Sequence, residues 1–387
     1  MLKTITFVLA VLATPLAAQQ CGRPFADFKA GLVTEAVTLG YERTSAEAFL
    51  SGARIDDAVL RADRSQGVFQ RDFIDFSRRL ISNNRLQNAS IQAQRQDAIF
   101  DRIEAEMGVP RGVLLAFWAF ETDFGAVQGD FNTLNALVTL SHDCRRPELF
   151  RPQIFAALEL FERGDFDPRT TTGAWAGEIG MVQMLPGDII ENGRDGDGDG
   201  HVRLKTSPQD ALLSGASVLS SLGWQAGQPW LQEVTVPAEM DWALSGTQTK
   251  LPAADWTAMG VTARSGSLPS LPASLILPMG RKGPAFLAYP NFDVYFEWNQ
   301  SFVYVLTAAY FGTRIEGAPI YNAGNPDAGL SGEQVQQLQR KLQARGHNVG
   351  GADGIIGART RAAIQAEQQR LGLPADAWPT PALLDAL

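Results

Sequence analysis

The sequence lacks three features that would each point to a particular class of protein. It has no block rich in lysine and arginine, and its net charge of −9 argues against a nucleic-acid-binding protein. Beyond a short apolar run at the N-terminus, no stretch approaches the roughly eighteen apolar residues of a membrane span, so we expect no transmembrane segment. Cysteine is nearly absent, and the two that occur limit the chain to a single disulfide.

The rest of the composition is that of a soluble globular protein. Apolar residues make up 45% of the sequence and charged residues 19%, so wholesale disorder is not expected. A chain of 387 residues is long enough for two or three domains with a sizeable core.

The N-terminus has the layout of a secretory signal peptide. Lys3 precedes the apolar run Ile5–Leu12, and small residues follow in Pro15–Gln19. We predict a signal peptide over residues 1–18 and therefore an exported protein.

Both cysteines, Cys21 and Cys144, remain after that cleavage. In an exported protein they indicate one disulfide, and two free thiols are the alternative. Lipidation of Cys21 is disfavoured because Gln20 stands where a lipidation signal has a small residue.

The segment Val113–Gly125 combines a long apolar run with a single carboxylate, Glu121. Helical spacing places this carboxylate on one face with large apolar side chains, and Gly125 is a plausible end of the helix. A carboxyl held against aromatic rings loses solvation of its charged form, which raises its pKa and lets it donate a proton near neutral pH. The alternative is a solvated residue in the last turn of a core helix. The residues sharing this face are Leu114, Phe117, Trp118, Glu121 and Phe124.

Most of the remaining pattern is helical. A long amphipathic helix is predicted over Ala89–Met107, and Phe292–Phe311 is predicted as an apolar helix with Asn299 and Tyr304 as polar positions. Short β-like pieces between Ala243 and Leu277 indicate a small strand-containing insertion. Further helices are predicted over Phe25–Leu39, Asp72–Leu80, Asn132–Ser141, Glu148–Arg163 and Asp210–Leu222.

An Asp/Gly loop beginning at Asp195 has the ligand spacing of a calcium-binding loop. Carboxylates occupy positions 1, 3 and 5 and a glycine position 6, but Thr206 replaces the final glutamate. We predict a weak structural cation site, with a simple Asp/Gly turn as the alternative. The expected ligands are Asp195, Asp197, Asp199, the backbone carbonyl of His201, and Asp210.

A Gly-, Pro- and Asn-rich stretch, residues 317–330, reads as a linker to a small module over residues 331–387. Gln336-Leu-Gln, Gly346 and Asp353-Gly-Ile-Ile-Gly-Ala-Arg-Thr360 resemble the three-helix peptidoglycan-binding domain of many wall enzymes.

Residues 24–316 resemble the lytic murein transglycosylase B family. The resemblance covers most of the chain. Its marks are Trp118-Ala-Phe-Glu121-Thr-Asp-Phe-Gly125, Cys144-Arg-Arg, Phe150-Arg, Gly173–Pro186, the Asp195–His201 loop, Phe286-Leu, Asn291-Phe and Asn299-Gln-Ser-Phe-Val-Tyr304.

The resemblance implies a mainly α, lysozyme-like catalytic domain with a small β-containing insertion. It implies that Glu121 is the only catalytic carboxylate and cleaves the bond between N-acetylmuramic acid and N-acetylglucosamine without water, leaving 1,6-anhydromuramic ends. One acid/base can serve both steps, because it gives a proton and then takes one back.

The resemblance also assigns the other parts of the site. Gln183, Met184, Asn299 and Tyr304 would bind substrate, and the Asp loop would hold structural Ca²⁺ or Na⁺, with no cofactor needed for the chemistry. The expected partner is the peptidoglycan glycan strand, and the protein is expected to be a periplasmic monomer.

Three departures from the family pattern leave alternatives open. Ala174 stands where members carry a serine, Gly187-Asp188 replaces a serine pair, and Glu178 stands where a small residue is usual. A hydrolase pairing Glu121 with Glu178 or Asp123 would need a second carboxylate about 5 Å away if retaining and about 6.5–9.5 Å if inverting. A wall-binding protein with a lapsed catalytic domain is the remaining alternative.

Overall fold

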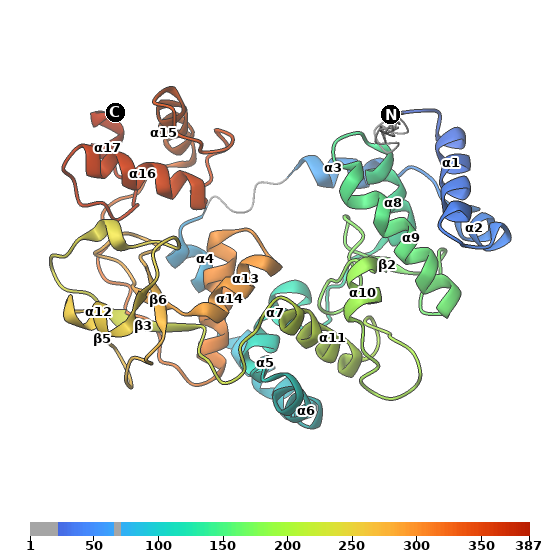
Figure 1. Cartoon of the computed structure of the whole chain (residues 1–387), viewed down its shortest axis with the longest axis horizontal. Helices are drawn as coiled ribbons and strands as arrows, with labels where there is room; N and C mark the ends of the chain where they lie inside the picture. Colours follow the sequence, from blue (N-terminus) through green and yellow to red (C-terminus); the bar gives the residue numbers. More distant parts are fainter. Residues whose placement is uncertain (1–21, 66–70) are drawn as a thin grey trace, which may run out of the picture. The chain divides into compact units, whose positions relative to one another are not determined.

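The computed structural model describes residues 22–65 and 71–387, which form two compact units. The first unit contains residues 22–65, 129–179 and 184–191, and the second contains residues 71–128, 180–183 and 192–387. Helices dominate both units, which confirms the predicted mainly α class (Figure 1). The expected signal peptide and Cys21 lie outside the described residues. Within these residues, no helix combines the length and apolar character needed to cross a bilayer.

The first unit is built on two long helices that lie side by side, α8 and α9 (Figure 1). The inner faces of both helices are apolar and buried, and α1, α2 and α3 complete the unit. Helices α1, α8 and α9 start and end within two residues of the predicted bounds, whereas no bounds were predicted for α2, α3 and α10. The helices of the unit are α1 (Phe25–Thr38), α2 (Arg43–Leu50), α3 (Asp57–Arg64), α8 (Thr133–His142), α9 (Pro147–Arg163) and α10 (Pro186–Asn192), with the antiparallel pair β1 (Phe131–Asn132) and β2 (Thr172–Gly173).

The second unit is organised around α7 (Arg111–Thr122), in which every residue from Gly112 to Ala119 is buried. This continuous burial explains the unbroken apolar run, since a helix enclosed on all sides needs no polar face. Its most extensive packing is against α14. The other helices around it are α4 (Phe73–Leu80), α5 (Asn83–Arg95), α6 (Asp97–Met107), α11 (Pro208–Ser221), α13 (Pro290–Trp298) and α14 (Phe302–Ile315).

Three predicted helix bounds in this unit are wrong. The helix over Ala89–Met107 is two helices that meet at Gln96, where φ is −109° and ψ is 23°. The helix over Phe292–Phe311 is interrupted at Asn299, which adopts extended backbone. Helix α7 ends before Gly125, because Asp123 already takes the left-handed conformation with φ of 51°.

An antiparallel sheet of five strands in the order β4-β6-β7-β3-β5 covers another part of the second unit. It confirms the expected strand-containing insertion and extends it on both sides of Ala243–Leu277. The sheet packs with α12 (Ala253–Ala258) around the fully buried Trp256. The strands are β3 (Leu231–Thr235), β4 (Leu251–Pro252), β5 (Thr262–Ala263), β6 (Pro272–Ile276) and β7 (Phe286–Ala288).

The C-terminal module also belongs to the second unit and has the three predicted helices. The stretch predicted as a linker has no helix or strand, but several hydrogen bonds hold it, of which two are examples. Tyr321 pairs with Ser77 at 2.9 Å between the hydroxyl oxygens, and the indole of Trp378 donates to the carbonyl of Asp327 at 2.9 Å. The helices are α15 (Gly332–Ala344), α16 (Ala358–Arg370) and α17 (Pro381–Ala386), and their shared core includes Leu338, Leu342, Ile364 and Leu383.

Candidate active site

Glu121 lies in the last turn of α7 with its carboxyl half-buried. Two side chains donate hydrogen bonds to the same carboxyl oxygen, Oε1. The hydroxyl of Tyr304 lies 2.5 Å away and the indole nitrogen of Trp298 lies 3.1 Å away. Burial, together with the negative charge of Glu121, holds the pKa of the Tyr304 hydroxyl well above its ordinary value. Tyr304 therefore keeps its proton and acts as a fixed donor to Glu121.

Aromatic rings enclose these two donors. Trp298 stacks on Phe117 with ring centroids 4.4 Å apart, and Tyr304 meets Phe120 edge-on at 5.9 Å. Phe117 is one helical turn before Glu121, so the predicted aromatic face of α7 is present. Contact with a neighbouring ring restricts the rotamers of Trp298 and Tyr304, which limits the direction of the hydrogen bond that each donates.

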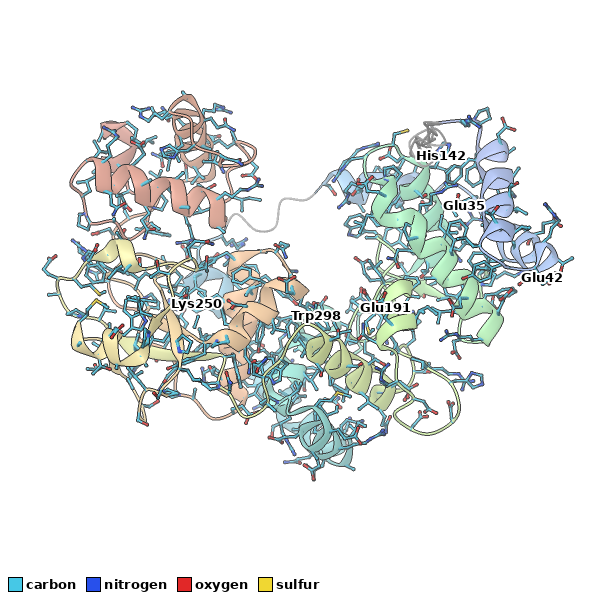
Figure 2. The ribbon with its side chains drawn as sticks, viewed as in Figure 1. Glu35, Glu42, His142, Glu191, Lys250 and Trp298 are labelled. Carbon is cyan, nitrogen blue, oxygen red and sulfur yellow. The ribbon has the colours of Figure 1, made fainter. Side chains whose placement is uncertain are left out.

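Trp298 contacts Glu121 but is not among the residues that the sequence predicted for the site. It stands at the end of α13 and is labelled in Figure 2. Its neighbour Asn299 was selected instead, from the resemblance. In the structure the Asn299 side-chain oxygen accepts a hydrogen bond from the backbone nitrogen of Ser301 at 2.8 Å, at the start of α14. The break at Asn299 thus orients both α13 and α14, which carry the two donors to Glu121.

The turn that follows Glu121 is tied to the segment 180–183. The Thr122 hydroxyl donates to the carbonyl of Met181 at 2.7 Å and accepts from the backbone nitrogen of Gly125 at 2.9 Å. Gln183, with φ of 53°, donates its side-chain amide to the carbonyl of Gly180 at 2.7 Å. The predicted site residue Gln183 is therefore held in the same unit as Glu121 by short, local contacts.

Met184 falls in the first unit, where it is buried and exchanges two backbone hydrogen bonds with Ile179, at 2.8 and 3.1 Å. Glu178 belongs to the same unit. Its Oε2 is buried and has no hydrogen-bond partner among the described residues, and burial raises the pKa of the carboxyl. Asp123, the other carboxylate considered, is paired with Arg85 at 3.0 Å.

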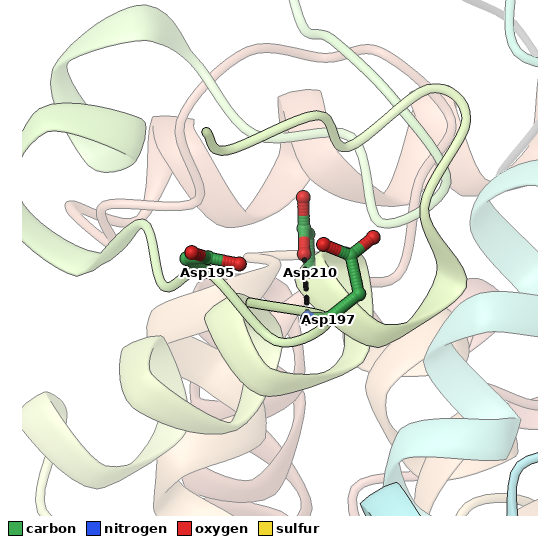
Figure 3. A group of neighbouring side chains, drawn as sticks. All are labelled: Asp195, Asp197 and Asp210. Atoms are coloured by element: carbon green, nitrogen blue, oxygen red, sulfur yellow. Dashed lines mark hydrogen bonds between the residues drawn. The ribbon is translucent and has the colours of Figure 1, made fainter. Parts of the chain in front are cut away.

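The Asp loop gathers three of the five expected cation ligands. Carboxylate oxygens of Asp195, Asp197 and Asp210 lie within 4.8 Å of one another (Figure 3). Asp210 is fully buried, and its oxygens accept from the backbone nitrogens of Gly196 at 2.9 Å and Arg203 at 2.7 Å. Three clustered carboxylates suit a hard cation such as Ca²⁺.

The two other expected ligands lie differently. The Asp199 carboxylate is paired with Arg203 at 2.7 Å, outside the group of three carboxylates. His201 was expected to contribute only its backbone carbonyl, and that role stays a prediction.

Comparison with known proteins agrees with this architecture. Residues 24–313 match the family described as the transglycosylase SLT domain, and residues 331–387 match a peptidoglycan binding domain. The chain belongs to the SLT transglycosylase family. The predicted resemblance is thereby confirmed, and family membership makes the protein a lytic transglycosylase that acts on peptidoglycan.

Three relatives from this family are informative. SltB3 from Pseudomonas aeruginosa, in complex with NAG-anhNAM-pentapeptide, is 36% identical with a TM-score of 0.86 over 94% of this chain and 99% of that one. Membrane-bound lytic murein transglycosylase B of Escherichia coli K12 is 26% identical over 71% of this chain and 79% of its own. The Escherichia coli lytic transglycosylase SLT35 in complex with calcium is 25% identical, with a TM-score of 0.66, over 78% of this chain and 97% of that one.

Proposed function

We propose that the protein cleaves the β-1,4 bond between N-acetylmuramic acid and N-acetylglucosamine with Glu121 as its only catalytic carboxylate. Glu121 protonates the glycosidic oxygen as the bond to C1 breaks. The carboxylate that results then removes the proton of the muramic 6-hydroxyl, whose oxygen bonds to C1 and closes the 1,6-anhydro ring. The proton balance returns the carboxyl to its starting state, and no water is consumed.

The observation that carries this proposal is the pair of donors on Glu121 Oε1. Donors stabilise the carboxylate formed after the first proton transfer, and they hold it in place for the second. Within the second unit, the neighbouring carboxylate Asp123 is neutralised by Arg85, so it is poorly suited to act as nucleophile or base.

The competing proposal is a hydrolase that uses Glu178 as its second carboxylate. Its buried, unpartnered oxygen is the observation in its favour. The raised pKa weighs against it, because a carboxyl that keeps its proton more readily is less often in the carboxylate form that a base or nucleophile requires.

We also propose that the substrate is a glycan strand that carries peptides. SltB3, the 36%-identical relative, was solved with a disaccharide that carries a pentapeptide. We assign Gln183, Met184 and Asn299 to sugar binding and Tyr304 to the positioning of Glu121. Ca²⁺ or Na⁺ at Asp195, Asp197 and Asp210 would stabilise the loop and takes no part in the chemistry.

The remaining parts of the proposal concern location. Export by the signal peptide at residues 1–18 would place the enzyme in the periplasm as a monomer, with a disulfide between Cys21 and Cys144. The module at residues 331–387 would raise the local concentration of the enzyme on the wall.

Mass spectrometry of products from purified sacculi tests the proposal. The wild type should release anhydro-ended fragments, which weigh one water less than hydrolysed ones, and Glu121→Gln should release none. Glu297→Gln is the matched control, because Glu297 is exposed on α13 beside Trp298. Hydrated ends from the wild type would establish the hydrolase, and no release by the wild type would leave only wall binding.

A further inference from the structure

A cavity of about 800 Å³ lies where the C-terminal module meets the rest of the second unit. Its walls come from the module, from the stretch 326–332, and from residues 300–303 at the start of α14. The same helix carries Tyr304, the donor to Glu121. The cavity is within the size range of small-ligand sites, which hold about 300–1,000 Å³.

The acidic residues that line this cavity already have partners. Asp75 is paired with Arg71 at 2.6 Å, and Asp327 with Lys282 at 2.7 Å. The Asp72 side chain accepts from a backbone nitrogen at 2.8 Å and caps α4. The negative charges of Asp75 and Asp327 are therefore compensated by cations, and Asp72 is engaged as a helix cap.

Arg361 on α16 differs from them. Its guanidinium lies over the ring of Phe302 at 4.4 Å, and one terminal nitrogen donates to the carbonyl of Pro278 at 2.7 Å. Its Nε is buried and has no hydrogen-bond partner among the described residues. Burial lowers the pKa of Arg361 to about 10, so the side chain still carries its charge at neutral pH.

The nearby acid does not use the remaining donors of this side chain. Asp376 acts on Arg361 through its charge, but its oxygens accept from the backbone nitrogen of Arg281 at 3.0 Å, and from the Gln368 amide and the backbone nitrogen of Trp378, each at 3.1 Å. A desolvated guanidinium with spare donors is a site for an anion, and it matches the planar geometry of a carboxylate.

We propose that this cavity binds the peptide stem of peptidoglycan, with a stem carboxylate on Arg361. The inference rests on the proposed function for the identity of the substrate. It adds a peptide site, formed jointly by the wall-binding module and the start of α14, to the sugar site around Glu121. Through Phe302, which is two residues before Tyr304, stem binding also bears on the helix that positions the catalytic carboxyl.

The test is a calorimetric titration of the full-length protein with a free pentapeptide, which has no sugar to bind near Glu121. The peptide is compared with its form in which every carboxylate is amidated. The wild type should bind the acidic form at least about tenfold more tightly, as expected for a charge-assisted hydrogen bond. Arg361→Met should abolish this preference while keeping an apolar chain over Phe302. Arg359→Met is the matched control, because it removes an exposed charge from the same helix.

A second variant keeps the test decisive if Arg361→Met unfolds. A Cβ on Gly357 would meet no atom within 4 Å, and Gly357 lines the same cavity, so Gly357→Phe should block the peptide and leave Arg361 in place. Equal binding of both peptide forms, equal loss in Arg359→Met, or undiminished binding in Gly357→Phe would each overturn the peptide site. Anhydro products from peptide-free glycan report on the proposed function separately, and Arg359→Met should still form them.

Discussion

The crossing of α7 and α14 gives a direct test of how the site is positioned, because these helices carry Glu121 and Tyr304. The backbones approach closely at Gly112, where an added Cβ would lie 2.8 Å from the carbonyl oxygen of Gly312 and 2.6 Å from Oε1 of Glu316. Glu316 can move, but it would then give up the hydrogen bond that it accepts from the backbone nitrogen of Gly112 at 2.7 Å. The carbonyl of Gly312 is backbone and cannot move without shifting α14.

Gly112→Ala should therefore destabilise the protein. Overpacking costs about 1–3 kcal/mol, and the lost hydrogen bond adds about 1 kcal/mol. The better helix propensity of alanine returns about 1 kcal/mol, so we expect a net loss of about 1–3 kcal/mol. A lower rate on sacculi should accompany it, because separating the helices lengthens the hydrogen bond from Tyr304 to Glu121.

Urea denaturation of the wild type and variant measures this loss. Gly215→Ala is the matched control. Gly215 is also in the middle of a buried helix, but its added Cβ would meet its nearest atom at 3.6 Å, which is ordinary contact. That variant should gain up to about 1 kcal/mol from helix propensity. If both variants shift stability in the same direction, the close approach of α7 and α14 is not as described.

Three further predictions concern single contacts. Tyr304→Phe removes the 2.5 Å hydrogen bond to Glu121 and should lower kcat/KM on sacculi by about 10- to 100-fold. Trp298→Phe removes the longer hydrogen bond, of 3.1 Å, and should lower kcat/KM by less. Steady-state kinetics measure both effects, and equal rates in the wild type and the two variants would refute the roles of Tyr304 and Trp298 as donors to Glu121. Asp210→Ala leaves buried backbone nitrogens unpaired and should lower the stability of the protein by about 1–3 kcal/mol even in the presence of a chelator. Added Ca²⁺ should raise the Tm of the wild type but not that of the variant. A variant Tm equal to that of the wild type in chelator would contradict this prediction. Although burial alone would raise the pKa of Glu367, hydrogen bonds from His347 and Arg370 lower it. The C-terminal module should therefore lose stability as the pH falls through the acidic range. Thermal melts recorded at several pH values should show a weaker pH dependence in Glu367→Gln.

Sequence periodicity was sufficient for the elements whose formation is local. The apolar run before Glu121 predicted a buried helix with an aromatic face, and α1, α8 and α9 of the first unit lie close to their expected bounds. The helix breaks were not predictable in this way. Gln96 and Asn299 do not strongly disfavour a helix, so the local sequence does not indicate a break at either residue. The non-helical backbone at both positions is compatible with the packing of the helices on either side.

The residues of the site also divide into those that local sequence predicts and those that depend on the tertiary fold. Glu121 was found from its own neighbours in the sequence, because the face of a helix can be read from spacing. Trp298 is 177 residues away, and nothing in its local sequence specifies that its indole reaches Glu121. Tyr304 stood out in the sequence only as a polar position of an apolar helix, and its role at the site was implied by the family resemblance, although it makes the shorter contact. The proton affinity of Glu121 stays a prediction, which a pH profile of the reaction would test.

The docking of the C-terminal module decides what a truncation would mean. A module joined by a free linker could be deleted with loss of wall binding alone. Here Arg361 covers Phe302, and the Gln365 amide donates to the carbonyl of Ser245 at 2.9 Å, so deletion of residues 331–387 exposes the start of α14. We therefore expect the truncated enzyme to lose binding to sacculi and also part of its rate on short peptide-free glycans, because Tyr304 is one half-turn from the exposed ring. Arg359→Met, which removes an exposed charge from the same helix as Arg361 and leaves the module in place, should retain the rate on those glycans. If the truncated enzyme cleaves them at the full wild-type rate, the module has no influence on the position of Tyr304.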